Sequence, residues 1–225
     1  MDKASVTTTM QEAAWDPVSD RTEGRYLPTS AHDLDQRRLV ARLRAGEADA
    51  VEELYVAYKK PIFGFLVRLT RDRHLAEDLF QNTWLKVSRS VERLREDTEL
   101  KAWIFTVARN EFRSYRRWQL IDLSRVFLFY RERDEPVLEA AGESDDGIAL
   151  ARVEKGLAAL GASDREVLLL VCVEGMEPQQ AATVLAISHA ALRQRLGRAR
   201  ARLKAALSKL EFGSGVETYA VARKR

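Results

Sequence analysis

Apolar residues recur at intervals of three and four along most of this chain, which is the spacing of one face of an α-helix. In the first half, helical segments are predicted around Leu39, Leu54, Leu79 and Ile104, and a further one is predicted to begin at Pro61. Short polar stretches separate these segments. No stretch alternates apolar and polar residues as a half-buried β-strand does, so the pattern predicts an all-α fold.

The helical period returns in the last third of the chain. Ser163 and Glu166 have the spacing of a capping box, and the apolar run "VLLLVCV" follows them. Pro178 predicts the first turn of a short helix, and Ser188 predicts the N-cap of a long one. The long helix carries a predicted buried stripe spaced four, three, four and four residues apart: Leu192, Leu196, Ala199, Leu203 and Leu207. Two helices joined by a tight turn in this way form a helix-turn-helix pattern.

Charge is distributed unevenly, although the formal net charge is only +3. Residues 132–147 hold seven acids and one base, whereas residues 188–209 hold seven Lys or Arg and no acid. Exposed helices usually mix the two signs, so a helix with one sign favours nucleic-acid binding over a merely solvated surface. In the long helix, Arg193, Gln194 and Arg198 are candidates for base edges, while Arg200 and Arg202 are expected to meet phosphate or water.

These patterns predict two small helical domains joined by an acidic flexible linker. Residues 1–31 lack periodicity and are expected to form a mostly disordered arm. The first helical domain is expected over 32–119, and the linker over 120–147, including the apolar run "VFLFY". The second helical domain is expected over 148–211. A flexible tail is expected over 212–225.

Composition excludes several classes of protein. Cys172 is the single cysteine, so a disulfide framework and a cysteine zinc site are excluded, and its apolar surroundings predict a buried thiol. No window approaches the ~18 apolar residues of a membrane span, and the N-terminus has no secretory signal. We therefore expect a cytoplasmic protein without membrane insertion, metal or cofactor.

Three stretches resemble the extracytoplasmic-function (ECF) group of bacterial RNA polymerase sigma factors. "LAEDLFQNTWLKV" is similar to the region 2 helix that binds core polymerase. "LREDTELKAWIFTVARNEFRSYRRW" resembles the segment that melts and recognises the −10 element, and residues 157–203 resemble region 4, which recognises the −35 element. The resemblance implies a sigma factor that binds core RNA polymerase and directs promoter-specific initiation by recognising both elements and melting DNA. Its partners would be core polymerase, promoter DNA (duplex at −35, single-stranded at −10) and an anti-sigma factor.

The resemblance also implies site residues. Arg109, Arg113, Arg116 and Arg117 lie at i, i+4, i+7 and i+8, which predicts one basic face, and Trp103 is expected to brace the core. For core-polymerase binding the candidates are Glu77, Asp78, Gln81, Trp84 and Leu85. For −10 DNA they are Arg95, Asp97, Asn110, Arg113, Arg116 and Arg117. For −35 DNA they are Ser188, His189, Ala191, Arg193, Gln194 and Arg198.

The chain departs from the family pattern at four places. Gln179 to Ala182 replace a common Glu-Glu-Ile-Ala, and Ala186 replaces the glycine of the turn. His189 to Leu192 replace Pro-Gly-Thr-Val at the start of the recognition helix, and Ser114 replaces a common Asp. The base preferences of relatives at −35 therefore do not transfer directly to this chain.

Two other classes of protein fit the sequence less well. An enzyme is disfavoured because the three histidines are scattered, with neither an HExxH motif nor a glycine-rich phosphate loop, and His74 with Asp78 alone is a weak metal site. A sensory regulator that binds DNA alone is disfavoured because a receiver domain needs alternating strands and helices. The acidic linker either threads toward the polymerase active-centre channel or is a plain tether.

Overall fold

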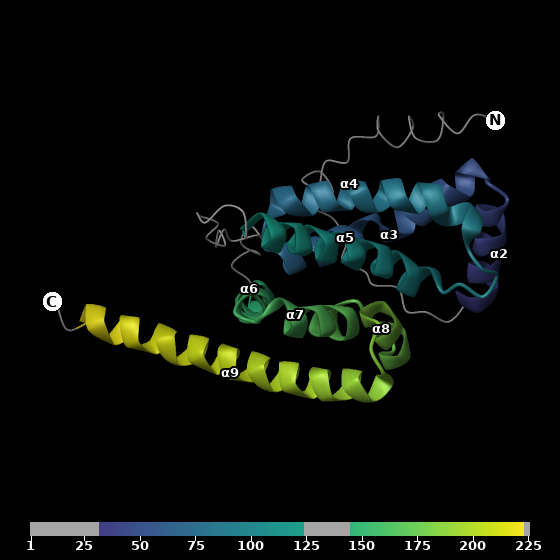
Figure 1. The fold of residues 1–225 in the computed structure, drawn as a ribbon. Coiled ribbons are helices and arrows are strands. Elements are labelled where there is room, and N and C mark those ends of the chain that lie inside the picture. The colour runs from purple at the N-terminus through teal and green to yellow at the C-terminus, as the bar shows by residue number, and fades with distance from the viewer. Residues whose placement is uncertain (1–31, 124–144, 223–225) are drawn as a thin grey trace.

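The computed structural model describes residues 32–123 and 145–222, and within these ranges the chain is helical, with no strand (Figure 1). The predicted all-α fold is confirmed. The N-terminal arm, most of the linker with its "VFLFY" run, and the last three residues lie outside the described residues. The helices group into a first unit, α2 to α5, and a second unit, α6 to α9.

The first unit contains α2 (His32–Arg44), α3 (Ala48–Thr70), α4 (Arg73–Ser90), a short 3₁₀ turn (Val91–Arg93) and α5 (Leu100–Leu123). In its core the long helices pack through aromatic rings. The rings of Phe65 on α3 and Phe105 on α5 pack edge to face, with their centroids 5.3 Å apart. Around them Leu54, Ile62, Leu66 and Ile104 are fully buried. This core fixes the outward faces of α4 and α5, which carry the candidate site residues.

The predicted helix break before Pro61 is wrong, because α3 runs through this proline as one helix of 23 residues. Proline has no N–H to donate to the carbonyl of Ala57, one turn earlier. Ala57 lies on an exposed part of α3, where a backbone carbonyl without its helical partner costs less than it would in the core. Leu54 and Ile62, on either side of the proline, are buried in the same core, which keeps the two halves in line.

The second unit contains α6 (Asp145–Ala158), α7 (Ala162–Leu168) with a π-helical continuation (Leu169–Val173), α8 (Pro178–Leu185) and α9 (His189–Ala222). In Figure 1, α9 runs beneath α6 and α7 and extends beyond them. The prediction that this helix ends near Leu210 is wrong, since it continues to Ala222. The glycines after Leu210 weaken a helix by roughly 1 kcal/mol each, but no proline follows to end it.

Two local predictions in the second unit are wrong. The residue that precedes α7 is Gly161 rather than Ser163, and Glu166 is buried instead of completing a capping box. Cys172 is exposed, because the apolar run passes through the π-helical turn. A π turn adds a residue to the helical repeat, so the side chains after it are rotated away from the buried face. Val173, next in the chain, is accordingly exposed as well.

The helix-turn-helix forms as the sequence predicted. Pro178 begins α8, and the Ser188 hydroxyl accepts a hydrogen bond from the Ala191 N–H at 3.2 Å, which caps α9. Leu192, Leu196 and Ala199 are buried. The turn between the helices depends on Ala186, whose φ of +52° lies in the left-handed region where glycine is favoured.

Candidate functional site

One row of side chains crosses the outer surface of α4. Glu77, Gln81 and Leu85 follow one another at four-residue intervals, and Asp78 lies beside the first of them. Gln81 and Asp78 are exposed, and Leu85 retains 39% of its exposure, which is high for an apolar residue next to the core. Glu77 accepts a hydrogen bond from Arg73 Nε at 3.2 Å. The helix thus presents two carboxylates, an amide and an aliphatic side chain together.

Trp84 does not belong to this surface, and its predicted place there is wrong. Its ring is 95% buried, with the Tyr55 centroid 4.8 Å away in an edge-on arrangement and Phe80 at 6.1 Å. The position falls on the inner stripe of α4 with Phe80 and Val87. Trp84 therefore braces α4 against α3 and directs the neighbouring Leu85 outward.

The loop before α5 is held as a defined turn. Arg95 and Asp97, both exposed, form a two-pronged ion pair, with Nε–Oδ1 at 3.0 Å and Nη2–Oδ2 at 3.2 Å. Thr98 closes the turn through its hydroxyl, which accepts from the Arg95 N–H at 3.0 Å, and through its own N–H. The turn places both charged side chains at the start of α5.

Further along α5, one exposed face is basic. Asn110, Arg113, Arg116 and Arg117 are all exposed, and their contact with DNA remains a prediction. The predicted continuation of this face to Arg109 is wrong, because that side chain is only 5% exposed. It points instead at the second unit, where its Nη1 donates to the Val184 carbonyl at 3.1 Å.

The recognition helix α9 presents its first turns to solvent. Six residues at the start of this helix are exposed: Ser188, His189, Ala191, Arg193, Gln194 and Arg198. The next arginines along the helix have partners within the protein, which the sequence did not indicate. Arg202 pairs with Asp164 while its side chain stays 64% exposed, so its contact with phosphate or water remains a prediction. Arg200 lies 3.9 Å from the Cys172 sulfur.

A buried carboxylate, that of Glu166, lies between the two units. Its Oε1 is 3.4 Å from Arg109 Nε on α5, and its Oε2 is 3.6 Å from Arg195 Nη2 on α9. Burial lowers the pKa of the Arg109 guanidinium, and the Glu166 charge acts against that shift. One side chain of α7 therefore links the basic helix of the first unit to the recognition helix of the second.

A buried arginine, Arg165, also joins the units. Its Nη1 donates to the Leu69 carbonyl at the end of α3, at 3.0 Å. Its Nε and Nη2 bind carbonyls at the end of α6 and just after it, including that of Leu160 at 2.7 Å. Beside it, Arg68 Nε and Glu154 Oε1 form a half-buried ion pair at 2.7 Å. These contacts seat the second unit on the end of α3.

Glu174, at the end of the π-helical turn, is another buried ionisable residue near this boundary. It is 5% exposed, and burial raises its pKa to about 7, while the charges of Lys101 and Arg68 act in the opposite direction. Lys101, on α5, donates to the Glu174 carbonyl. Neither periodicity nor charge pattern identified this residue, because its burial depends on how the units pack.

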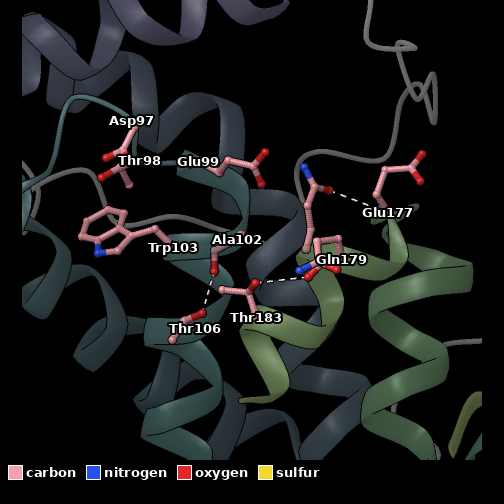
Figure 2. Close-up of a pocket in the computed structure, with 10 residues that line it drawn as sticks. Asp97, Thr98, Glu99, Ala102, Trp103, Thr106, Glu177, Gln179 and Thr183 are labelled. Carbon is pink, nitrogen blue, oxygen red and sulfur yellow. Dashed lines mark hydrogen bonds between the residues drawn. The ribbon is translucent and has the colours of Figure 1, made fainter. Parts of the chain in front are cut away.

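A groove lies where the loop before α5 meets α8 (Figure 2). Trp103 packs on the core with part of its surface, as expected, and contributes another part to the groove. The side chains drawn in Figure 2 come from both units: Asp97, Thr98, Glu99, Trp103 and Thr106 on one side, and Glu177, Gln179, Gln180 and Thr183 on the other. In this arrangement α8 therefore faces the predicted −10 loop.

The described residues contain no group of three His, Cys, Asp or Glu side chains arranged to hold a metal ion. Over the same residues, no helix is long and apolar enough to cross a membrane.

Comparison with known proteins identifies both units. The model of sigma-70 region 2 matches residues 54–119, and that of sigma-70 region 4 matches residues 150–203. The RNA polymerase sigma factor CarQ of Myxococcus xanthus is 33% identical over 173 residues, which are 76% of this chain and 97% of CarQ. The ECF RNA polymerase sigma factor SigM of Bacillus subtilis is 28% identical over 156 residues, 69% of this chain and 93% of SigM.

A solved structure shares the fold of both units. The sigma factor RpoE of Bartonella quintana, in complex with the anti-sigma factor NepR, superposes with a TM-score of 0.62 at 27% identity, covering 70% of this chain and 96% of RpoE. The family matches fall on the unit that carries the α4 and α5 surfaces and on the unit that carries the recognition helix. The chain belongs to the ECF group of bacterial RNA polymerase sigma factors, and so binds core RNA polymerase and directs transcription initiation at promoters that it recognises.

Proposed function

We propose that the exposed surfaces of α4, α5 and α9 have different roles in initiation: binding core polymerase, the −10 element and the −35 element, respectively. On α4, Glu77, Asp78, Gln81 and Leu85 bind core polymerase. Two carboxylates beside an exposed leucine suit a partner surface that is basic and apolar. Trp84 acts through the fold by holding this helix in place, since its ring is buried.

The −10 element is assigned to the loop before α5 and to the outer face of α5. Arg113, Arg116 and Arg117 are exposed on successive turns and can follow the phosphates of one strand. Asn110 offers a donor and an acceptor to an unpaired base edge. The Arg95–Asp97 pair stiffens the loop that receives the melted strand.

The −35 element is assigned to the first turns of α9. Arg193, Gln194 and Arg198 reach base edges in the major groove, because the early residues of such a helix enter the groove. Ser188, His189 and Ala191 lie at the end of the helix that meets the DNA. The observation that carries this proposal is the exposure of all six residues at the start of α9, where Leu192 and Leu196 are buried.

The two units must separate for both elements to be recognised at once. The −35 and −10 elements are about 25 base pairs apart, or roughly 85 Å at ~3.4 Å per base pair. In the structure, Glu166 binds an arginine from α5 and another from α9. The packed arrangement cannot span that length of duplex, so we propose that binding to polymerase and promoter opens it. We therefore expect the free protein to bind promoter DNA weakly.

An anti-sigma factor is a proposed further partner. The RpoE structure contains the anti-sigma factor NepR, and its fold matches both units of this chain. The place of action is the cytoplasm, where core polymerase transcribes. Purification of the full chain from its host, with identification of bound proteins, tests this partner; recovery with polymerase subunits alone would contradict it.

Run-off transcription with purified core polymerase and a promoter library tests the functional assignment as a whole. Core polymerase plus this chain is expected to start at a discrete set of promoters that share two elements. A known sigma factor serves as the positive control for the core enzyme. Initiation by that control, with none by this chain on any template, would overturn the assignment.

A further inference from the structure

Trp118, near the end of α5, is unusually exposed for a tryptophan. It keeps 71% of its exposure, whereas Trp84 is 5% exposed and Trp103 packs partly on the core. Single exposed apolar residues are common on protein surfaces, so exposure alone assigns no role. The surroundings of the ring decide what could bind it.

Trp118 lies on the same helical row as Asn110. Asn110, Ser114 and Trp118 are spaced four residues apart, so their side chains lie along one side of α5. Arg113 and Arg117 flank this row, also four residues apart, and both are exposed. From residue 112 to residue 119 there is no acid. The ring is therefore the aromatic end of a basic, hydrogen-bonding strip.

An exposed aromatic ring beside arginines matches the chemistry of unpaired nucleic acid. Arginines neutralise the phosphates of a strand, and an aromatic face stacks on a base of any sequence once that base has left the duplex. A protein partner for this strip would need an acidic surface around an apolar contact. The assignment of Asn110 to promoter DNA makes nucleic acid the simpler occupant, and this inference rests on that proposed function.

We propose that Trp118 is a stacking platform for one base at the edge of the melted −10 region. Eight residues separate it from Asn110, which is about 12 Å along a helix axis. At about 3.4 Å per nucleotide, that distance spans three to four nucleotides of a stacked strand. Trp118 therefore meets a base three or four positions from the one at Asn110.

The test uses holoenzyme assembled from core polymerase and the full chain, on a premelted form of a promoter recovered by run-off selection. Each base of the melted region is replaced in turn by 2-aminopurine, whose fluorescence falls when it stacks. With Trp118→Ala, the 2-aminopurine fluorescence is expected to rise at one position. That position should lie three or four nucleotides from the position that Asn110→Ala affects. Affinity for the premelted template is expected to fall about 5- to 100-fold, and Trp118→Phe to restore most of it.

Val56→Ala is the matched control, because Val56 is 59% exposed on α3 and lies away from the proposed surfaces. Affinity within twofold of wild type for Trp118→Ala would overturn the proposal, as would a loss of core-polymerase binding with unchanged DNA contacts. If Asn110→Ala and Arg193→Ala are also without effect, the proposed promoter surfaces themselves fail. If those two lose promoter recognition while Trp118→Ala does not, only the stacking role fails.

Discussion

Arg109 of the first unit and Glu166 of the second lie 3.4 Å apart, Nε to Oε1, and both side chains are buried. They come from different family regions, 57 residues apart in sequence. Arg109 precedes Asn110, which is assigned to the −10 element, and Glu166 also binds Arg195 of the recognition helix. The contact that holds the units together thus uses the two helices that are assigned to promoter DNA.

Arg109→Ala is expected to open the packed arrangement. The substitution removes the contacts of Arg109 with Glu166 and with the Val184 carbonyl, and a hydrogen bond to a charged group contributes about 1.5–3 kcal/mol. Glu166 keeps Arg195, so the second unit stays folded. Small-angle scattering of the free protein should show a larger radius of gyration.

Two companion variants sharpen this prediction. Glu154→Gln weakens the separate Arg68 ion pair across the boundary and should act in the same direction. Glu52→Gln removes an exposed acid of α3 and should leave scattering unchanged. An unchanged radius of gyration for both boundary variants would contradict the role of these contacts.

Stability is expected to depend on Glu174 between about pH 4.5 and 7. Burial raises the pKa of this carboxyl to about 7 in the folded protein, so the folded state holds a proton that the unfolded state has lost. The contribution of this carboxyl to stability is therefore fully present at low pH and is lost as pH rises through 7. The loss lowers the free energy of unfolding by at most about 3 kcal/mol. Glu174→Gln should be more stable than wild type at pH 8 and similar to it at pH 5.

Chemical denaturation at several pH values measures this difference. Comparison with the Gln variant isolates Glu174 from the other groups that titrate. If the free energies of unfolding of wild type and Glu174→Gln change in parallel with pH, the Glu174 carboxyl is not buried in solution.

Ala186→Gly is expected to stabilise the second unit by about 1 kcal/mol. At φ +52° the alanine Cβ is crowded, whereas glycine adopts this conformation without that penalty. Thermal unfolding should show a higher midpoint. Ala205→Gly is the matched control: it lies exposed inside α9, and glycine there should lower stability by about 1 kcal/mol. A change of the same sign in the unfolding midpoint at both sites would contradict the left-handed conformation of Ala186.

Leu85→Ala and Trp84→Ala, at neighbouring positions of α4, should impair different properties of the protein: polymerase binding in the first and folding stability in the second. Leu85 is exposed, so its truncation should weaken binding to core polymerase while the unfolding midpoint stays near that of wild type. Trp84 is buried against Tyr55, so its truncation should cost about 3–5 kcal/mol of stability. Polymerase titration and thermal unfolding of both proteins separate the two roles. Loss of stability in Leu85→Ala would place that residue in the core instead.

Local features were predictable from the sequence because their causes are local. The Ser188 cap, Pro178 at the start of α8 and the stripe containing Leu192 each depend on a few neighbouring residues. The place of Arg109 was not predictable, since only the packing of α8 on α5 separates it from the exposed arginines of its own helix. Cys172 was misplaced because a π-helical turn changes the repeat within an apolar run.

We propose that separate surfaces of this sigma factor select the two promoter elements. The most direct test of this proposal is sequencing of run-off transcripts from a randomised promoter library, with wild type, Arg193→Ala and Asn110→Ala in turn. Arg193→Ala should relax base selection at −35 alone, by about 1–3 kcal/mol at one position, and Asn110→Ala should relax it at −10 alone. Identical base preferences for all three proteins would contradict the claim.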